Sequence, residues 1–250
     1  MMPGLALFLV AILGAAMGEA MGHSLRRQLP LLLAFGGAFL LGLCFLHLLP
    51  EAFTANGRAG LWVIGGFLVQ IGLEYLSKGM EHGHVHGNRF GAVAFASLCL
   101  HAFIEAMPFG LDEVASSAHD HGHDHGGHHH HHHDQGGDEG GWSLLLGIGL
   151  HKLPVAIALM TILRATVTSR MRRWTWVLVF ALTPVAGILL AGRLPQDAAT
   201  FGALNGLLVG ILLHIATTIL FETADGHEFN ARKFLTVLLG LGLSLFTTRL

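Results

Sequence analysis

Two apolar segments of the chain each carry a histidine where a membrane span ordinarily has none. The first holds His101 with Glu105 four residues later, and the second holds His151. Each histidine lies about ten residues into its segment, which at 1.5 Å per residue is the middle of a bilayer roughly 30 Å thick. Ionisable groups at that depth cost at least about 2.5 kcal/mol each and usually mark a functional site. An imidazole and a carboxylate on one helical face, beside a second imidazole, are good ligands for a divalent transition metal.

The composition is that of an integral membrane protein. Of the 250 residues, 52% are hydrophobic and 12% are charged, and the mean hydropathy is +0.59. Soluble domains carry about 25% charged residues, so the lipid bilayer is the expected surrounding. The net charge of −2 gives no reason to expect nucleic acid as a partner.

Hydropathy predicts one transmembrane domain over residues 1–250, all-α, with eight helical spans. No positively charged stretch precedes the first span, so we interpret it as a retained helix and not as a cleaved signal. The last span is short. The eight are Leu5–Met21, Pro30–Phe53, Leu61–Ser77, Phe90–Leu111, Trp142–Leu163, Trp174–Leu190, Thr200–Phe221 and Phe234–Phe246.

Lysine and arginine are distributed unevenly between the two sides of the predicted bundle. One side has only Arg58, Arg193 and Arg249. Because cytoplasmic loops are richer in these residues, we expect both termini outside the cytoplasm, in a multi-pass protein of the cell (inner) membrane. The loops after spans one, three, five and seven hold Arg26, Arg27, Lys78, Arg89, Arg164, Arg170, Arg172, Arg173, Arg232 and Lys233.

The segment between the fourth and fifth spans, 112–141, is rich in His, Asp and Gly. It cannot form a hydrophobic core, which predicts a disordered extracytoplasmic loop that collects metal ions. A purification tag would also contain six consecutive histidines, but tags sit at termini and further His-Asp repeats flank this run. A smaller cluster, His82, His84 and His86, falls on the cytoplasmic side. The loop histidines are His119, His121, His123, His125, His128, His129, His130, His131, His132 and His133.

Further ionisable residues lie at other depths. His47 and Glu51 are near the outer end of span two, and His214 and Glu222 are in the inner part of span seven. Together they suggest a pathway of nitrogen and oxygen ligands from outside to inside. Chains of His and Glu also relay protons through membranes, but the His-rich loop favours metal as the cargo. Glu51 has a second interpretation, as a cap for the outer end of its helix.

Other polar residues and prolines in the spans have simpler explanations. We interpret Glu19, His23, Gln70, Glu74 and Glu222 mainly as interface or packing residues, with the lining of an exit path as the alternative. Pro154 and Pro108 each free a helical carbonyl one turn earlier. Such a carbonyl either lines a polar cavity or simply accompanies a kink that serves packing. Both interpretations stay open for Pro154, and we favour the packing kink for Pro108.

The chain resembles the ZIP transporters of zinc and other divalent metals. That family has a His-Asn-x-x-Glu/Asp-Gly pattern in span four and a His-Glu-x-Pro-like pattern in span five. The matching stretches here begin at His101 and His151. The His47-Leu-Leu-Pro-Glu51 ending of span two and the Gly210…His214…Glu222 arrangement of span seven are also similar. The resemblance implies a 3+2+3 inverted-repeat bundle around spans four and five, a form suited to alternating access.

Two departures from the family pattern bear on the number of metal ions. The second site of a two-metal ZIP centre draws on positions that are Ala102 and Lys152 here, and Val155 replaces a carboxylate found in some members. An ammonium repels a cation, so the resemblance implies one metal site formed by His101, Glu105 and His151. Lys152 would then supply the charge of the second metal and form an ion pair with Glu105. The His-Lys-x-Pro version of span five resembles one branch of the family.

These observations predict a transporter, and not an enzyme, that moves a divalent transition metal into the cytoplasm. Zn²⁺ is expected first, because nitrogen-rich sites suit it, with Fe²⁺, Mn²⁺, Co²⁺ and Cd²⁺ as alternatives. Two other functions stay open: a membrane metal sensor that does not transport, for which Lys152 is the best argument, and an intramembrane metalloenzyme. No His-Glu-x-x-His motif occurs, which disfavours the enzyme. A homodimer is left open as the oligomeric state.

Overall fold

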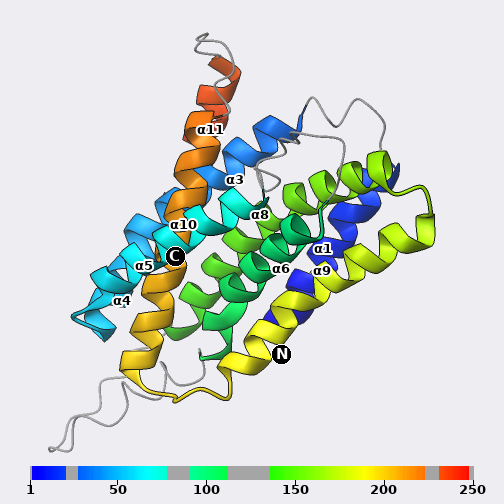
Figure 1. Ribbon diagram of the computed structural model, residues 1–250. Helices are drawn as coiled ribbons and strands as arrows, with labels where there is room; N and C mark the ends of the chain where they lie inside the picture. The colour runs from blue at the N-terminus through cyan, green and yellow to red at the C-terminus, as the bar shows by residue number, and fades with distance from the viewer. Residues whose placement is uncertain (1, 21–27, 78–90, 112–135, 223–230, 248–250) are drawn as a thin grey trace, which may run out of the picture.

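The structure is a computed structural model that describes residues 2–20, 28–77, 91–111, 136–222 and 231–247 (Figure 1). Nearly all of these residues are helical, and none of them lies in a strand, which confirms the all-α prediction. The elements are α1 (Met2–Ala20), α3 (Leu29–Leu43), a π-helical segment (Cys44–Leu48), α4 (Leu49–Ala55), α5 (Ala59–Ser77), α6 (Ala92–Ala106), a 3₁₀ helix (Met107–Gly110), α8 (Gly136–Thr166), α9 (Arg170–Ala191), α10 (Ala198–Glu222) and α11 (Ala231–Thr247).

The predicted spans correspond to these helices. Seven spans in the described part of the chain are long and apolar enough to cross a bilayer, with α3, the π-helical segment and α4 forming one of them. The eighth, α11, has 17 residues and takes the place of the short last span. The helix α8 begins at Gly136 and so reaches into the predicted 112–141 loop. Residues 112–135, His23 and the cluster His82, His84 and His86 lie outside the described residues.

Local residues determine several helix ends. Pro30 lies in the first turn of α3, where its missing N–H costs nothing. Pro108 lies in the 3₁₀ helix that follows α6, so it ends that helix and does not kink it. Asp197 precedes α10 and accepts a 2.7 Å hydrogen bond from the backbone N–H of Thr200. This hydrogen bond lowers the pKa of the Asp197 carboxyl from its ordinary value.

The spans pack as two groups of four. In one group, α1 packs against α8 and α9, and α6 packs against α9. In the other, α10 packs against α5 and α3, and α11 packs against α3. Figure 1 shows α5 and α10 on one side of the bundle and α1 and α9 on the other. The groups meet where α5 packs on α6 and α3 on α8.

This pairing matches the expected inverted repeat. Exchanging spans one to three with spans six to eight, and span four with span five, maps the α1–α8 pair onto the α9–α6 pair. The same exchange maps the α5–α10 pair onto the α11–α3 pair. The contact pattern therefore agrees with the 3+2+3 arrangement, whose two central spans are α6 and α8.

Small residues four positions apart bring the closest helix pairs together. A Cβ on Gly14 would lie 2.6 Å from the Leu153 carbonyl oxygen, and one on Gly18 would lie 2.9 Å from that of Ile157. On α10, Gly206 and Gly210 face α5 in the same way. Without a hydrophobic force between helices in lipid, this close backbone approach provides much of the packing energy.

We expect Gly210→Ala to destabilise the bundle. The added Cβ would fall on the Val63 carbonyl oxygen and 2.6 Å from the backbone nitrogen of Phe67, neither of which can rotate away. Overpacking of this kind costs about 1–3 kcal/mol. Unfolding of the purified protein in detergent measures the loss.

Gly65→Ala is the matched control, because nothing lies within 4 Å of its Cβ position. Alanine is the better helix former by about 1 kcal/mol, so this variant should be neutral or slightly more stable. Equal stability of the two variants would contradict the packing described for α5 and α10.

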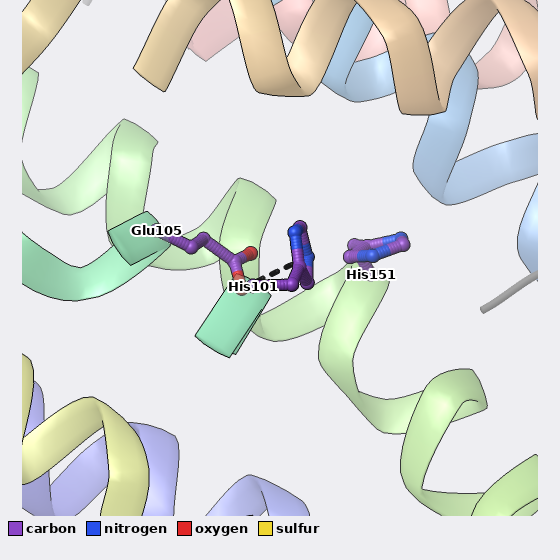
Figure 2. Close-up of side chains that lie close together, drawn as sticks. All are labelled: His101, Glu105 and His151. Carbon is purple, nitrogen blue, oxygen red and sulfur yellow. Dashed lines mark ion pairs between the residues drawn. The ribbon is translucent and has the colours of Figure 1, made fainter. Parts of the chain in front are cut away.

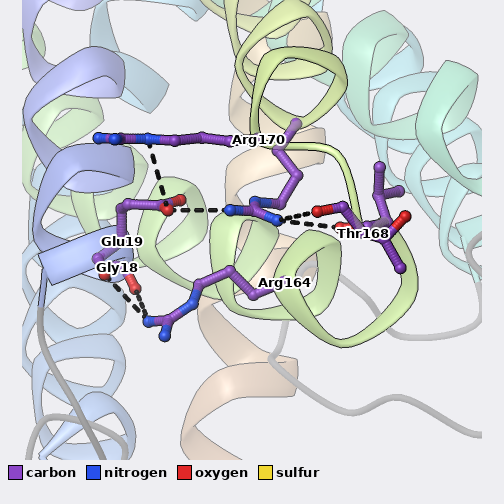
Figure 3. Close-up of polar contacts among 7 residues, drawn as sticks. Gly18, Glu19, Arg164, Thr168 and Arg170 are labelled. Carbon is purple, nitrogen blue, oxygen red and sulfur yellow. Dashed lines mark hydrogen bonds and ion pairs between the residues drawn. The ribbon is translucent and has the colours of Figure 1, made fainter.

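An arginine cluster joins α1 to the connection between α8 and α9 (Figure 3). Arg173 donates to Glu19 Oε1 at 3.0 Å and to the carbonyl oxygens of Val167 and Thr168. Arg164 donates to the last carbonyls of α1, on Gly18 and Glu19. Because α1, α8 and α9 belong to the same group of four, these contacts stabilise the packing within that group. This agrees with the interpretation of Glu19 as a packing residue.

Candidate metal centre

The buried centre begins with two residues of α6. His101 and Glu105 are one helical turn apart, so their side chains leave the same face. His101 Nε2 lies 3.6 Å from Glu105 Oε2, and the two side chains are 3% and 1% exposed. Figure 2 shows the carboxylate directed toward the imidazole. This part of the site follows from helical spacing alone.

The third residue, His151, comes from α8. Its side chain is 2% exposed, and its ring is nearly perpendicular to that of His101, with centroids 6.1 Å apart. Ligand atoms of His101, Glu105 and His151 all lie within 4.8 Å of one another. Metal–ligand bonds of about 2.0–2.2 Å place tetrahedral ligands roughly 3.4 Å apart, so small side-chain rotations would close the three around an ion. The structure thus brings together the three residues that the sequence selected.

Lys152 is buried beside this cluster. Its Nζ lies 3.4 Å from Glu105 Oε2 and 5.2 Å from the centre of the Phe180 ring, and its side chain is 2% exposed. The predicted ion pair between Lys152 and Glu105 is therefore present. A buried carboxylate needs such a countercharge, because a lone charge at this depth would be costly.

Gln70 of α5 also contacts the centre. Its Oε1 lies 3.1 Å from His101 Nδ1, and its side chain is fully buried. Our interpretation of Gln70 as a packing residue missed this contact. In the sequence, the only signal was an uncharged polar residue in an otherwise apolar part of a span.

A comparison with protein families finds a similarity over the C-terminal part of the chain. The family model described as ZIP zinc transporter matches residues 134–248, which include His151, Lys152 and His214. Over these residues the chain is similar to the ZIP family. ZIP proteins are divalent metal transporters and not enzymes. No curated protein matches the chain.

The outer pair His47 and Glu51 forms a second polar cluster. His47 lies in the π-helical segment that precedes Pro50, a distortion frequent at functional sites. Its Nε2 is 4.0 Å from Glu51 Oε2. Glu51 also accepts a 3.2 Å hydrogen bond from Asn205 Nδ2 on α10, a contact that the sequence did not predict. Among the described residues, these side chains do not join the buried three-residue cluster.

His214, which the sequence places on the inner part of the predicted pathway, pairs with a residue of α5. Its Nε2 is in direct contact with the Glu74 carboxylate, and the Phe67 ring packs edge-on against the imidazole at 4.9 Å. Glu74, which we interpreted as a packing residue, is therefore part of a His–Glu pair. Glu222 is the last residue of α10, and its side chain lies outside the described part of the structure.

Proposed function

We propose that this protein carries Zn²⁺ through a single site formed by His101, Glu105 and His151. The observation that carries the proposal is the burial of three ligand side chains from two helices within 4.8 Å of one another. Three protein ligands leave a fourth position exchangeable, as transient binding requires. Two nitrogens and one oxygen favour zinc and its neighbours over magnesium and calcium.

We infer that transport runs into the cytoplasm, with both termini outside in the cell (inner) membrane. The support is the excess of Lys and Arg in the loops after spans one, three, five and seven. By the same charge rule, the His-rich segment would face the opposite side and would receive the ion first. The cluster of His47, Glu51 and Asn205 would then form the entrance, and Glu74 with His214 would follow the central site on the way in.

Uptake of radioactive zinc into proteoliposomes tests the transport proposal. We expect saturable uptake that Cd²⁺ and Co²⁺ inhibit and that Mg²⁺ and Ca²⁺ at about 100-fold excess do not, because hard cations prefer oxygen ligands. Empty liposomes are the control. Uptake that Mg²⁺ inhibits as well as Cd²⁺ would contradict the proposed substrate class.

A metal sensor is the second candidate, and the buried Lys152 beside Glu105 favours it. Binding without transport would stabilise the protein, by about 2.7 kcal/mol at an ion concentration 100 times the Kd, yet give no uptake. Zinc-dependent stabilisation in detergent together with zero flux in proteoliposomes would therefore establish the sensor and overturn the carrier.

Deleting residues 119–133 should affect uptake only when zinc is scarce. A collecting loop raises the local ion concentration and does not touch the central site. We expect the KM for zinc to rise severalfold while the maximal rate stays within about twofold. Initial uptake rates across a range of zinc concentrations measure both quantities. Replacing the segment by Gly and Ser residues of equal length controls for the connection, and a fall in the maximal rate alone would argue against a collecting role.

A further inference from the structure

We propose that Gln70 is a positioning residue that presents His101 to the metal in one tautomer. The inference rests on the proposed function, because it assigns a role around the same site. The geometry behind it is the 3.1 Å contact between Gln70 Oε1 and His101 Nδ1.

The chemistry of the contact determines where the imidazole proton lies. An amide oxygen accepts hydrogen bonds and cannot donate them, so Nδ1 of His101 must be the donor. In the neutral ring, Nε2 then keeps its lone pair. Nε2 is also the atom that lies 3.6 Å from Glu105 Oε2. Two acceptor atoms therefore face each other at a separation that a cation between them would stabilise.

A second buried hydrogen bond joins the same two helices one turn away from the contact between Gln70 and His101. Ser97, one turn before His101 on α6, donates to the Leu73 carbonyl oxygen of α5 at 2.6 Å, and this contact is buried. The two contacts join the same two helices one turn apart. Gln70 itself is fully buried, and a buried amide is costly unless it is hydrogen-bonded.

A histidine that binds a metal through one ring nitrogen ordinarily donates a hydrogen bond from the other to a partner group. Such a partner fixes the tautomer and ring orientation, and losing it typically weakens metal binding about 10–100-fold. Gln70 supplies this partner from a different four-helix group than the one that holds the three ligands. The oxygen is uncharged, so it orients the imidazole without adding a negative charge to the site.

The test compares variants that keep or remove the acceptor at position 70. Gln70→Met has similar size but no acceptor, and Gln70→Asn keeps an amide that is too short to reach His101. We expect both to weaken Zn²⁺ binding about 10–100-fold in a competition with a chromophoric chelator. Gln70→Glu keeps an acceptor at the same distance and adds a negative charge, so its affinity should equal or exceed that of the wild type. The visible absorption of bound Co²⁺ should be changed in the Met and Asn variants and retained in the Glu variant.

Ser97→Ala is the matched control. It removes the neighbouring buried hydrogen bond between α6 and α5 without touching His101, so it should lower stability and leave Zn²⁺ affinity within about threefold. Unchanged affinity in Gln70→Met and Gln70→Asn would overturn the positioning role. An equal loss in Gln70→Glu, or in Ser97→Ala, would also overturn it. If the wild-type protein bound no Zn²⁺ at all, the proposed function itself would fail.

Discussion

We expect the His151→Ala variant to fold but to lose zinc uptake. His151 is the one ligand of the proposed site that α8 contributes. Without it, the ion keeps only His101 and Glu105 on a single turn of α6, a pair that binds weakly because water must fill the other positions. The loss should exceed the roughly 10–100-fold that removal of an outer-shell partner causes. Initial uptake rates in proteoliposomes, together with the Zn²⁺ dissociation constant in detergent, measure it.

Two controls make this result specific. His151→Cys supplies a thiolate, which also binds zinc and favours Cd²⁺, so it should retain part of the uptake and shift preference toward cadmium. Unfolding of the metal-free His151→Ala variant shows whether the fold has survived. Uptake within about threefold of the wild type in a folded His151→Ala protein would contradict the site that we propose.

Replacing Lys152 by methionine should tighten zinc binding and slow transport. The Lys152 ammonium lies 3.4 Å from Glu105 Oε2, and both side chains are almost fully buried. It competes with the ion for that carboxylate and repels the ion directly. Two unit charges about 4 Å apart interact by roughly 4 kcal/mol at an effective dielectric constant of 20. Removing one should therefore lower the Zn²⁺ dissociation constant by at least about tenfold and slow release of the ion.

The same change should destabilise the metal-free protein. Breaking a buried ion pair costs about 3–5 kcal/mol, because Glu105 loses the ammonium that lies 3.4 Å from its Oε2. Bound Zn²⁺ replaces that charge, so most of the stability should return when zinc is added. Chelator competition and unfolding with and without zinc measure the two effects.

Lys152→Arg keeps the positive charge, so it separates the effect of the charge from the effect of side-chain packing. We expect its zinc affinity to stay within a few-fold of the wild type, since a guanidinium still compensates Glu105. If Lys152→Met bound zinc as the wild type does, or more weakly, Lys152 would not be acting as the charge that stands in for a second ion.

Much of the architecture was predictable because membrane burial leaves a direct mark on sequence. Apolar stretches of about 20 residues correspond to spanning helices, since every backbone polar group in lipid must be paired within the helix. The ends of α8 and α6 were less predictable. Hydropathy does not mark polar helical turns, so it placed the start of α8 too late, and it extended span four through the 3₁₀ helix that contains Pro108.

The contacts between spans were the part that sequence reasoning missed. In the sequence, Gln70 and Glu74 are both polar residues of an apolar helix. That pattern does not distinguish a packing residue from one that contacts a functional group. Only the packing of α5 against α6 and α10 shows that the first meets His101 and the second meets His214. Asn205, which donates to Glu51, carried no signal because the two are far apart in the chain.

The amino-acid sequence was enough to locate the spanning helices and to select His101, Glu105 and His151 as candidate ligands. It could do so because an ionisable residue in the middle of an apolar span is expensive wherever the span packs. Helical spacing also placed His101 and Glu105 on one face. The tertiary structure confirmed that Lys152 pairs with Glu105, and it alone revealed the contacts of Gln70 with His101 and of Glu74 with His214. Those contacts depend on which helices pack together and at what rotation, and side-chain packing over the whole bundle sets both.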